Sequence, residues 1–542
     1  MKIKQILSSD KLQEWVLIIF SVFWVLVVML DYLNKQIYYI PSITHFKYGL
    51  LFTGLIALGV ILSGSYTRHS IFSKIPPLKV NGLMILGLMI IVVWSIVAGY
   101  NVYWKAPLGF QNYLHLALKV ITTLGGAFIL TLATYSAGNL FRGRLLPQGD
   151  QNLLTFALLD ISLGFLFYSL ILMLLGAFGL LHTYVIIGVL ALLILINYQS
   201  SFDFTLKTLW SPLKKPDDLH FWGAFIAFMI LVYVAMNYLY TQAPFPLGFD
   251  ARNYYVNIPK LISESGYLIE GFQPYAWSLI MATGFIAFGS PEITMFISVL
   301  GGLLSLFAIY DLSKNHIKIG SNSSLLVALL YLITPTVTNH FIIEFKIDLS
   351  LVFIQLVIIT VFIKWLNSKE GGIQELFSDT KDRNYLIVIG LLMGFCLSIK
   401  VLSLFLTVAL FVAVWWFYKN IPAVLGSSAL AIGLIIASGF DRESGLREYH
   451  LSPNITGFAL IGIGLAFLLL ALLKNKKTFL DVTKSISMIG ICCLLTFSPW
   501  IYKNYSYTKS LSPIELLVGK KPTPSLNMED IQKNYNQSIK KQ

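Results

Sequence analysis

The chain consists of apolar runs of helical length that follow one another with short polar connections. A helix of roughly 20 apolar residues is long enough to cross the hydrocarbon core of a bilayer. Of the 542 residues, 56% are hydrophobic and only 12% are charged, which leaves too little polar surface to cover a water-soluble globule of this size. The sequence therefore predicts an all-α polytopic membrane protein with about 13–15 transmembrane helices.

The runs fall into two groups on either side of residue 220. We expect an N-terminal six-helix module of unknown role at 1–220, a second membrane module at 221–513 and a polar C-terminal tail at 514–542. The first module has runs at 14–31, 48–64, 81–99, 113–135, 152–179 and 182–197. The second has runs at 222–240, 292–312, 324–341, 349–365, 385–399, 402–418, 423–439, 455–473 and 484–502.

A long loop at 241–291 separates two of the spans in the second module. It contains a short apolar stretch from Ala276 to Gly289, bounded by Pro274 and Pro291. A stretch of about 14 residues is too short to span a bilayer, so we expect a re-entrant or interfacial helix.

Basic residues in the short loops set the expected orientation. A net charge of +13 could indicate a nucleic-acid partner, but the Lys and Arg residues lie between apolar runs, where they act as topology signals. Alternating the loops from a cytoplasmic N-terminus places most of them inside, as expected for the cytoplasmic membrane. The basic segment Met1 to Lys11 precedes a long run without a small-residue cleavage site, so we expect no cleaved signal peptide.

The same alternation puts several widely separated polar groups on the external face, beginning with Asp250 in the loop at 241–291. A carboxylate beside hydrocarbon is costly, and Pro244 and Pro246 stiffen the backbone that leads to it. Asp250 is a candidate general base, because partial shielding from water can move a carboxyl pKa towards the working pH. The alternative is an ordinary loop aspartate paired with Arg252. The other external groups are Glu344 with Asp348, Lys400 and the 500–504 region.

His340, Glu344 and Asp348 are spaced by four residues and would share one face if a helix continued through them. Three readings remain open: a divalent metal site, a polar helix end with Asp348 as its N-cap, and a substrate-binding or second acidic role. No cofactor is singled out beyond that weak metal candidate. The three cysteines lie inside apolar runs without metal-site spacing and indicate packing.

Two lysines follow apolar runs and are candidates for binding a lipid phosphate. Lys400 lies between two runs, and Lys503 with Asn504 ends the last one. A cation beside a bilayer suits an anionic headgroup, while snorkelling of a helix-end lysine is the alternative. Asp160 lies deep in the fifth run. An acid inside a membrane span is functional by default, and the alternative is a neutral carboxyl hydrogen-bonded to a neighbouring helix. Lys119 is a possible partner of Asp160.

Four segments, in this order, resemble the GT-C superfamily of integral membrane glycosyltransferases, in particular the bacterial relatives of protein mannosyltransferases and aminoarabinose transferases. They are Gly248-Phe249-Asp250 with the following tyrosines, the 274–289 stretch, the glycine-rich span from Gly390 to Lys400, and Pro499-Trp500 followed by Lys503-Asn504, with Pro513 beyond. The resemblance covers about 221–513. The chain departs from it where Ala251 replaces a second adjacent acid, where Lys503 replaces arginine, and in having six spans before the loop.

The resemblance implies an inverting transfer of a sugar from a polyprenyl-phosphate carrier to a lipid, glycan or protein acceptor on the external, periplasmic side. Asp250 would deprotonate the acceptor. Arg252, Tyr254, Tyr255, Glu344 and Asp348 would bind donor or acceptor. Lys400, Lys503 and Asn504 would bind the lipid phosphate. A lipid-linked glycan polymerase or ligase, a transporter or flippase of lipid-linked sugars, and a non-catalytic scaffold are the alternatives; the expected partners include membrane lipids but no nucleic acid.

Overall fold

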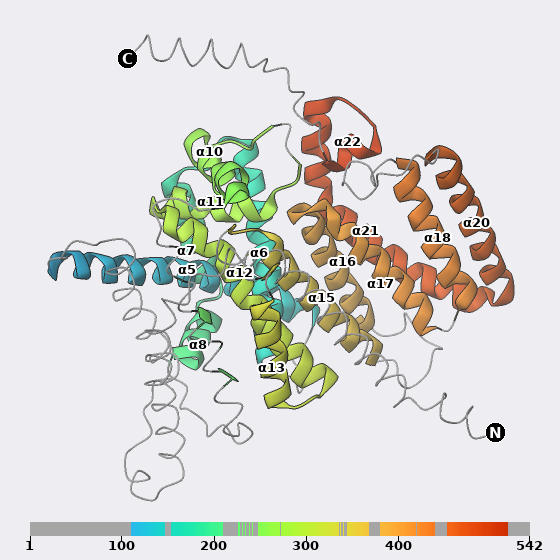
Figure 1. Cartoon of the computed structure of the whole chain (residues 1–542), viewed down its shortest axis with the longest axis horizontal. Helices are drawn as coiled ribbons and strands as arrows, with labels where there is room; N and C mark the ends of the chain where they lie inside the picture. Colours follow the sequence, from blue (N-terminus) through green and yellow to red (C-terminus); the bar gives the residue numbers. More distant parts are fainter. Residues whose placement is uncertain are drawn as a thin grey trace, which may run out of the picture.

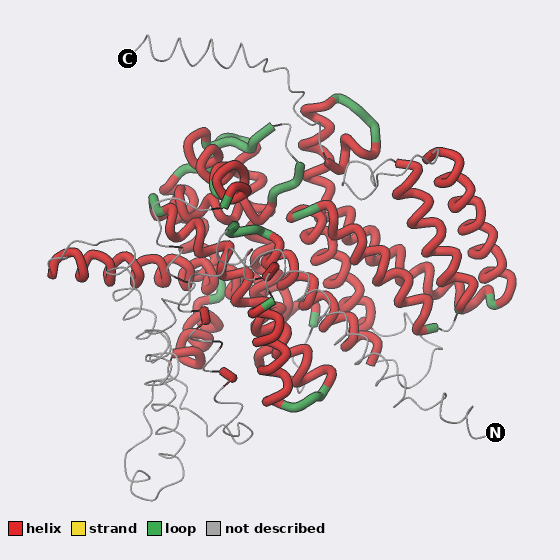
Figure 2. The backbone as a smooth tube through the Cα atoms, viewed as in Figure 1, coloured by secondary structure: helices red, strands yellow, loops and turns green. Residues whose placement is uncertain are grey.

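The computed structural model describes residues 110–146, 153–209, 248–270, 273–334, 344–367, 380–418, 420–438 and 453–518, with isolated residues in 226–241 and at 336, 337 and 340. The spans predicted at 14–31, 48–64 and 81–99, most of the one at 222–240, and the tail beyond 518 lie outside these ranges. Within them the chain is helical, and the loops lie between helix ends (Figure 2).

The protein is an all-α polytopic membrane protein. Seven described helices are long and apolar enough to cross a membrane, or eight if the pair Thr183–Leu195 and Tyr198–Thr205, bent by 83°, is one span. The first half of the described chain contains α5 (Phe110–Leu145), α6 (Leu153–Ala177), α7 (Thr183–Leu195), α8 (Tyr198–Leu209), η4 (Ala251–Tyr255), α10 (Asn257–Ser265), α11 (Ala276–Phe288), α12 (Pro291–Asp311), η5 (Leu312–Ile317) and α13 (Ser321–Ile333). The second half contains α15 (Asp348–Asn367), α16 (Thr380–Ile399), η6 (Val401–Ser403), α17 (Leu404–Phe417), α18 (Ile421–Ser438), α20 (Pro453–Lys474), α21 (Lys476–Thr508) and α22 (Pro513–Val518).

The predicted short helix is present as α11, and protein surrounds it. Most of its residues are buried, and it contacts α6, α7, α10, α12 and α16. The Tyr168 hydroxyl of α6 lies 2.8 Å from the Thr283 hydroxyl of α11. The helix ends at Gly289, whose φ of 60° is the left-handed conformation that glycine adopts without a Cβ penalty. This C-cap turns the chain directly into α12.

Helices α16 and α21 pack closely and run parallel. A Cβ at Gly390 would collide with Ile489 and Cys492, and one at Gly394 would collide with Cys493 and Thr496. The two sets of residue numbers rise together, so the C-terminal ends of both helices lie at the same end of the molecule. We call this the site end; it also carries α10 and α22 (Figure 1).

The opposite end gathers other helix termini. The Asn384 side chain, near the start of α16, donates a hydrogen bond of 2.6 Å to the carbonyl oxygen of Leu145 at the end of α5. At the junction of α12 and η5, Asp311 accepts hydrogen bonds from Thr155, near the start of α6. Helix α15 lies beside α12 in the parallel sense, because Ser298 contacts Lys346 and Gly301 faces Ser350.

Candidate functional site

The centre of the site is the segment at 344–348, which leads into α15. Its polar residues Glu344, Lys346 and Asp348 are half-buried, whereas Phe345 and Ile347 between them are buried. The apolar pair packs into the core while the three charged side chains remain available to other elements. The segment therefore carries one ammonium group, Lys346, between the carboxylates of Glu344 and Asp348.

Glu344 binds the backbone of the loop at 241–291 where η4 begins. Its Oε2 accepts hydrogen bonds from the backbone N–H groups of Asp250 and Ala251, at 3.1 and 3.3 Å. These N–H groups open the turn η4, and such groups at a helix start lack partners within the helix. A carboxylate also interacts favourably with the positive end of a helix dipole. Glu344 thus fixes the backbone that carries Asp250.

Two lysine–carboxylate pairs complete the cluster. The Lys346 Nζ lies 2.8 Å from Oδ2 of Asp250, and the Lys400 Nζ donates to Oδ1 of Asp348 at 2.6 Å. Oδ2 of Asp348 is buried and makes no hydrogen bond with any described residue. The segment 344–348 therefore links the polar loop to the turn between α16 and α17, and we call Asp250, Glu344, Lys346, Asp348 and Lys400 the charged cluster.

Tyr255 and His340 adjoin this cluster. Burial, reinforced by the charges of Asp348, Asp250 and Glu344, raises the pKa of Tyr255 far above its ordinary value. The hydroxyl is consequently protonated at every physiological pH and can donate a hydrogen bond. The charges of Asp348, Lys346, Lys400 and Glu344 all act on His340.

The remaining loop candidates face outward. Arg252 and Tyr254 are exposed, and Tyr255 is half-buried. Asp250 itself forms an ion pair with Lys346. Arg252 and Tyr254 therefore lie on the solvent-facing side of the loop.

The expected helical face of His340, Glu344 and Asp348 is not formed. The backbone from Glu344 to Ile347 is not helical, and Phe345 has a φ of 44°. The helical spacing of four residues therefore does not apply across this break. Among the described residues, no group of three His, Cys, Asp or Glu side chains is arranged to hold a metal ion.

Lys503 and Asn504 belong to a second group at the site end. The Lys503 ammonium lies 4.9 Å from the ring centre of Tyr275 and 5.4 Å from that of Trp500, within cation–π range. The two rings pack edge to face at 4.9 Å, and the Asn504 amide donates to the carbonyl oxygen of Leu516 at 2.9 Å. We call Tyr275, Trp500, Lys503 and Asn504 the aromatic group. The parallel packing of α16 and α21 puts it at the same end as Lys400.

No family model, curated protein or solved structure matches this chain. The geometry of the charged cluster and the aromatic group is therefore the basis for the functional proposal. The charged cluster brings together residues from the loop, from the segment before α15 and from the end of α16.

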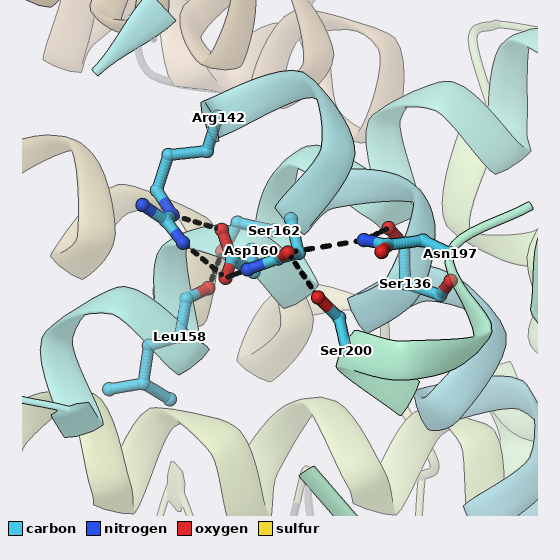
Figure 3. A network of polar contacts seen from close by, with 8 residues as sticks. Ser136, Arg142, Leu158, Asp160, Ser162, Asn197 and Ser200 are labelled. Atoms are coloured by element: carbon cyan, nitrogen blue, oxygen red, sulfur yellow. Dashed lines mark hydrogen bonds and ion pairs between the residues drawn. The ribbon is translucent and has the colours of Figure 1, made fainter. Parts of the chain in front are cut away.

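Asp160 lies in a separate buried network near the opposite end (Figure 3). Arg142 binds both of its carboxylate oxygens, through Nε and Nη2, and the Asn139 amide donates to Oδ2 at 2.9 Å. Asn139 in turn accepts from Asn197 at 3.1 Å and from Ser200 at 2.8 Å. The suggestion of Lys119 as the partner of Asp160 is wrong, because Lys119 forms its ion pair with Glu292 at the start of α12.

Lys346 is a residue of the charged cluster that was not among the site residues predicted from the sequence. It lies midway between Glu344 and Asp348, whose spacing of four suggested a helix. The detectable signal is the alternation of charged and apolar residues in Glu344-Phe345-Lys346-Ile347-Asp348, which has a period of two rather than 3.6. That period predicts three charged side chains on one side of a non-helical segment.

Proposed function

We propose that the protein is a membrane glycosyltransferase that moves a sugar from a polyprenyl-phosphate-linked donor to a lipid, glycan or protein acceptor on the external face of the cytoplasmic membrane. The observation that carries this proposal is the charged cluster, which joins Asp250 to Lys400 through Glu344, Lys346 and Asp348. A carboxylate base and cations for a departing phosphate are the two components that such a transfer needs.

In this proposal the acceptor oxygen or nitrogen attacks the anomeric carbon of the donor sugar. The bond from that carbon to the phosphate oxygen breaks, and its electron pair remains on the lipid phosphate. Asp250 takes the proton of the acceptor, and inversion at the anomeric carbon follows from a single displacement. Lys400 stabilises the developing charge on the phosphate, which is commonly a large contribution to catalysis.

The other candidates receive binding roles. Tyr255 donates its hydroxyl proton as a hydrogen bond to the sugar, while Arg252 and Tyr254 contact the donor or acceptor from the exposed side. Lys503 and Asn504, in the aromatic group, bind the lipid phosphate along its path or after release. Glu344 keeps Asp250 in position, and Asp348 orients Lys400.

The distribution of basic residues supports an external site. At the opposite end, helices α5, α15 and α20 each carry a basic residue in the last turn, and α21 starts with two. Short loops rich in Lys and Arg are retained in the cytoplasm. This distribution supports an external position for the charged cluster, which lies at the site end. The basic residues are Arg142, Arg144, Lys364, Lys474, Lys476 and Lys477.

The proposal is tested with purified protein in proteoliposomes, using labelled polyprenyl-phosphate monosaccharides and a membrane extract as the acceptor pool. We expect Asp250→Asn to lower transfer by about 100-fold or more, because general-base catalysis contributes about 10²–10⁴-fold. Glu264→Gln, at an exposed carboxylate on α10, is the matched control and should leave transfer unchanged. Full activity of Asp250→Asn would remove Asp250 as the base, and an inactive wild-type protein across the donor panel would contradict the transferase assignment.

A further inference from the structure

Lys346 is held by its backbone on both sides, while its side chain reaches out to Asp250. Its N–H donates to the carbonyl oxygen of His340 at 3.2 Å, and its own carbonyl oxygen accepts from the Ser298 hydroxyl at 3.1 Å. The buried neighbours Phe345 and Ile347 add to this anchoring. The flexible four-carbon stem can therefore swing its ammonium group while the main chain stays in place.

The position of Asp250 does not depend on Lys346. Glu344 holds the N–H groups of Asp250 and Ala251, and Ala251 is fully buried. The ion pair between Lys346 and Asp250 can consequently open without moving the backbone at either residue. Opening would leave the carboxylate in place and able to accept a proton.

The ion pair is also exposed enough to exchange partners. The side chain of Asp250 is 38% exposed and that of Lys346 is 20% exposed, and ion pairs of such exposure contribute little net stability. A phosphate offers a lysine more negative charge and more acceptor oxygens than one carboxylate does. Lys346 lies two residues before Asp348, the partner of Lys400, so both ammonium groups belong to the same charged cluster.

We propose that Lys346 is a donor-phosphate-binding residue that exchanges partners: it neutralises Asp250 in the empty site and moves to the phosphate when the polyprenyl-phosphate donor binds. This inference rests on the proposed function and adds an order to it. The donor binds first, its phosphate draws Lys346 away, and the freed Asp250 carboxylate then accepts the proton of the acceptor. In the empty site, the base is engaged by a cation.

The exchange can be measured without any sugar transfer. A water-soluble carbodiimide activates the Asp250 carboxyl, the Lys346 amine attacks it, and an amide joins the two residues with release of the urea by-product. Peptide mass spectrometry then quantifies this 250–346 crosslink in the full-length protein. The 260–264 crosslink, between Lys260 and Glu264 on the exposed face of α10, is measured in the same sample as an internal reference, because that pair lies outside the charged cluster.

We expect saturating polyprenyl phosphate to lower the 250–346 crosslink at least fivefold relative to the 260–264 crosslink. Uncharged polyprenol and inorganic phosphate at the same concentration should leave the ratio unchanged. An equal effect of inorganic phosphate would overturn the assignment to a lipid-linked donor. Lipid that fails to bind, or that binds without lowering the crosslink, would overturn the exchange.

Variants give a second measurement. Lys346→Gln should weaken polyprenyl phosphate binding about tenfold, and Lys346→Arg should restore most of it, since a tenfold change is what one modest charge contact contributes. Lys260→Gln, at a lysine paired with Glu264 on the exposed face of α10, is the matched control and should bind normally. The two proposals fail separately: transfer that requires Asp250 while the crosslink ignores the lipid refutes only the exchange, whereas transfer that ignores Asp250 refutes the catalytic role.

Discussion

The charged cluster and the Asp160 network both pair acids with bases, yet they differ in how completely the charges are enclosed. Side-chain exposure is 3% for Arg142 and 1% for Asp160, against 20% for Lys346 and 38% for Asp250. Both carboxylate oxygens of Asp160 are bonded, whereas Oδ2 of Asp348 has no partner among the described residues. An enclosed pair whose carboxylate is bonded through both oxygens holds helices together, while a half-exposed pair can exchange partners with a ligand.

The largest effect expected from this contrast is on stability, at Arg142. Arg142→Met should destabilise the protein by about 3–5 kcal/mol, because it leaves Asp160 as a buried charge without its cation. The free energy of unfolding in detergent measures this. The double variant Arg142→Met with Asp160→Leu should recover most of the loss, since replacing both partners by apolar residues is often neutral. A double variant as unstable as Arg142→Met alone would contradict the interpretation that the loss comes from the unpaired charge of Asp160.

In the charged cluster the corresponding effect should fall on activity. Glu344→Ala removes the acceptor for two backbone N–H groups. We expect the loss in positioning Asp250 to equal about one hydrogen bond to a charged group, about 1.5–3 kcal/mol, so transfer should fall by about 10–100-fold. Glu344→Gln keeps an acceptor oxygen and should retain more activity than Glu344→Ala. Equal activity of the two variants would argue against a positioning role for Glu344.

Tyr255 sharpens the comparison through pH. Its pKa is raised in the folded protein, so the folded state resists ionisation that the unfolded state undergoes above pH of about 10. Stability that is fully present below that pH is therefore lost as the pH rises further. Between pH 9 and 11, the free energy of unfolding of Tyr255→Phe should fall by about 1 kcal/mol less than that of the wild type. If the free energy of unfolding fell equally with pH in the two proteins, the raised pKa of Tyr255 would be contradicted.

The smallest effect is expected at Lys346 itself. Lys346→Gln should change the free energy of unfolding by less than about 1 kcal/mol, as is usual for a partly exposed ion pair. Circular dichroism during thermal unfolding compares this variant with Arg142→Met under the same conditions. A loss as large as that of Arg142→Met would place Lys346 among the structural charges and not among the exchangeable ones.

Several helix positions could be read from the sequence, because hydrophobic length indicates where a helix can lie in a membrane. The run predicted at 152–179 is α6 at Leu153–Ala177, and the short stretch from Ala276 is α11. The choice of Asp250, Glu344, Asp348 and Lys400 as external polar groups followed from the same count of spans. Their assembly into one cluster could not be predicted in this way. Glu344 bonds to Asp250, 94 residues away in the chain, and Lys400 bonds to Asp348, 52 residues away.

The pairing of charges was the least predictable property. Lys119 and Arg142 lie on the same helix, and only the packing of α5 against α6 and α12 decides that Arg142 meets Asp160 while Lys119 meets Glu292. Lys346 was passed over because a spacing of four suggested a helix where the chain turns at Phe345. Long-range partners and single left-handed residues leave little trace in local periodicity.

The hairpin of α18 and α20 has a consequence for how this fold can vary. Trp415, near the end of α17, stacks on Phe479, near the start of α21, with ring centres 5.2 Å apart. The end of α17 and the start of α21 thus lie together. Helix α20 lies at the edge of the molecule (Figure 1), and most of its residues are not buried. Helices α18 and α20 pack mainly on each other, so shortening or exchanging them would leave α16 and α21 in register and the charged cluster intact at the far end of α16.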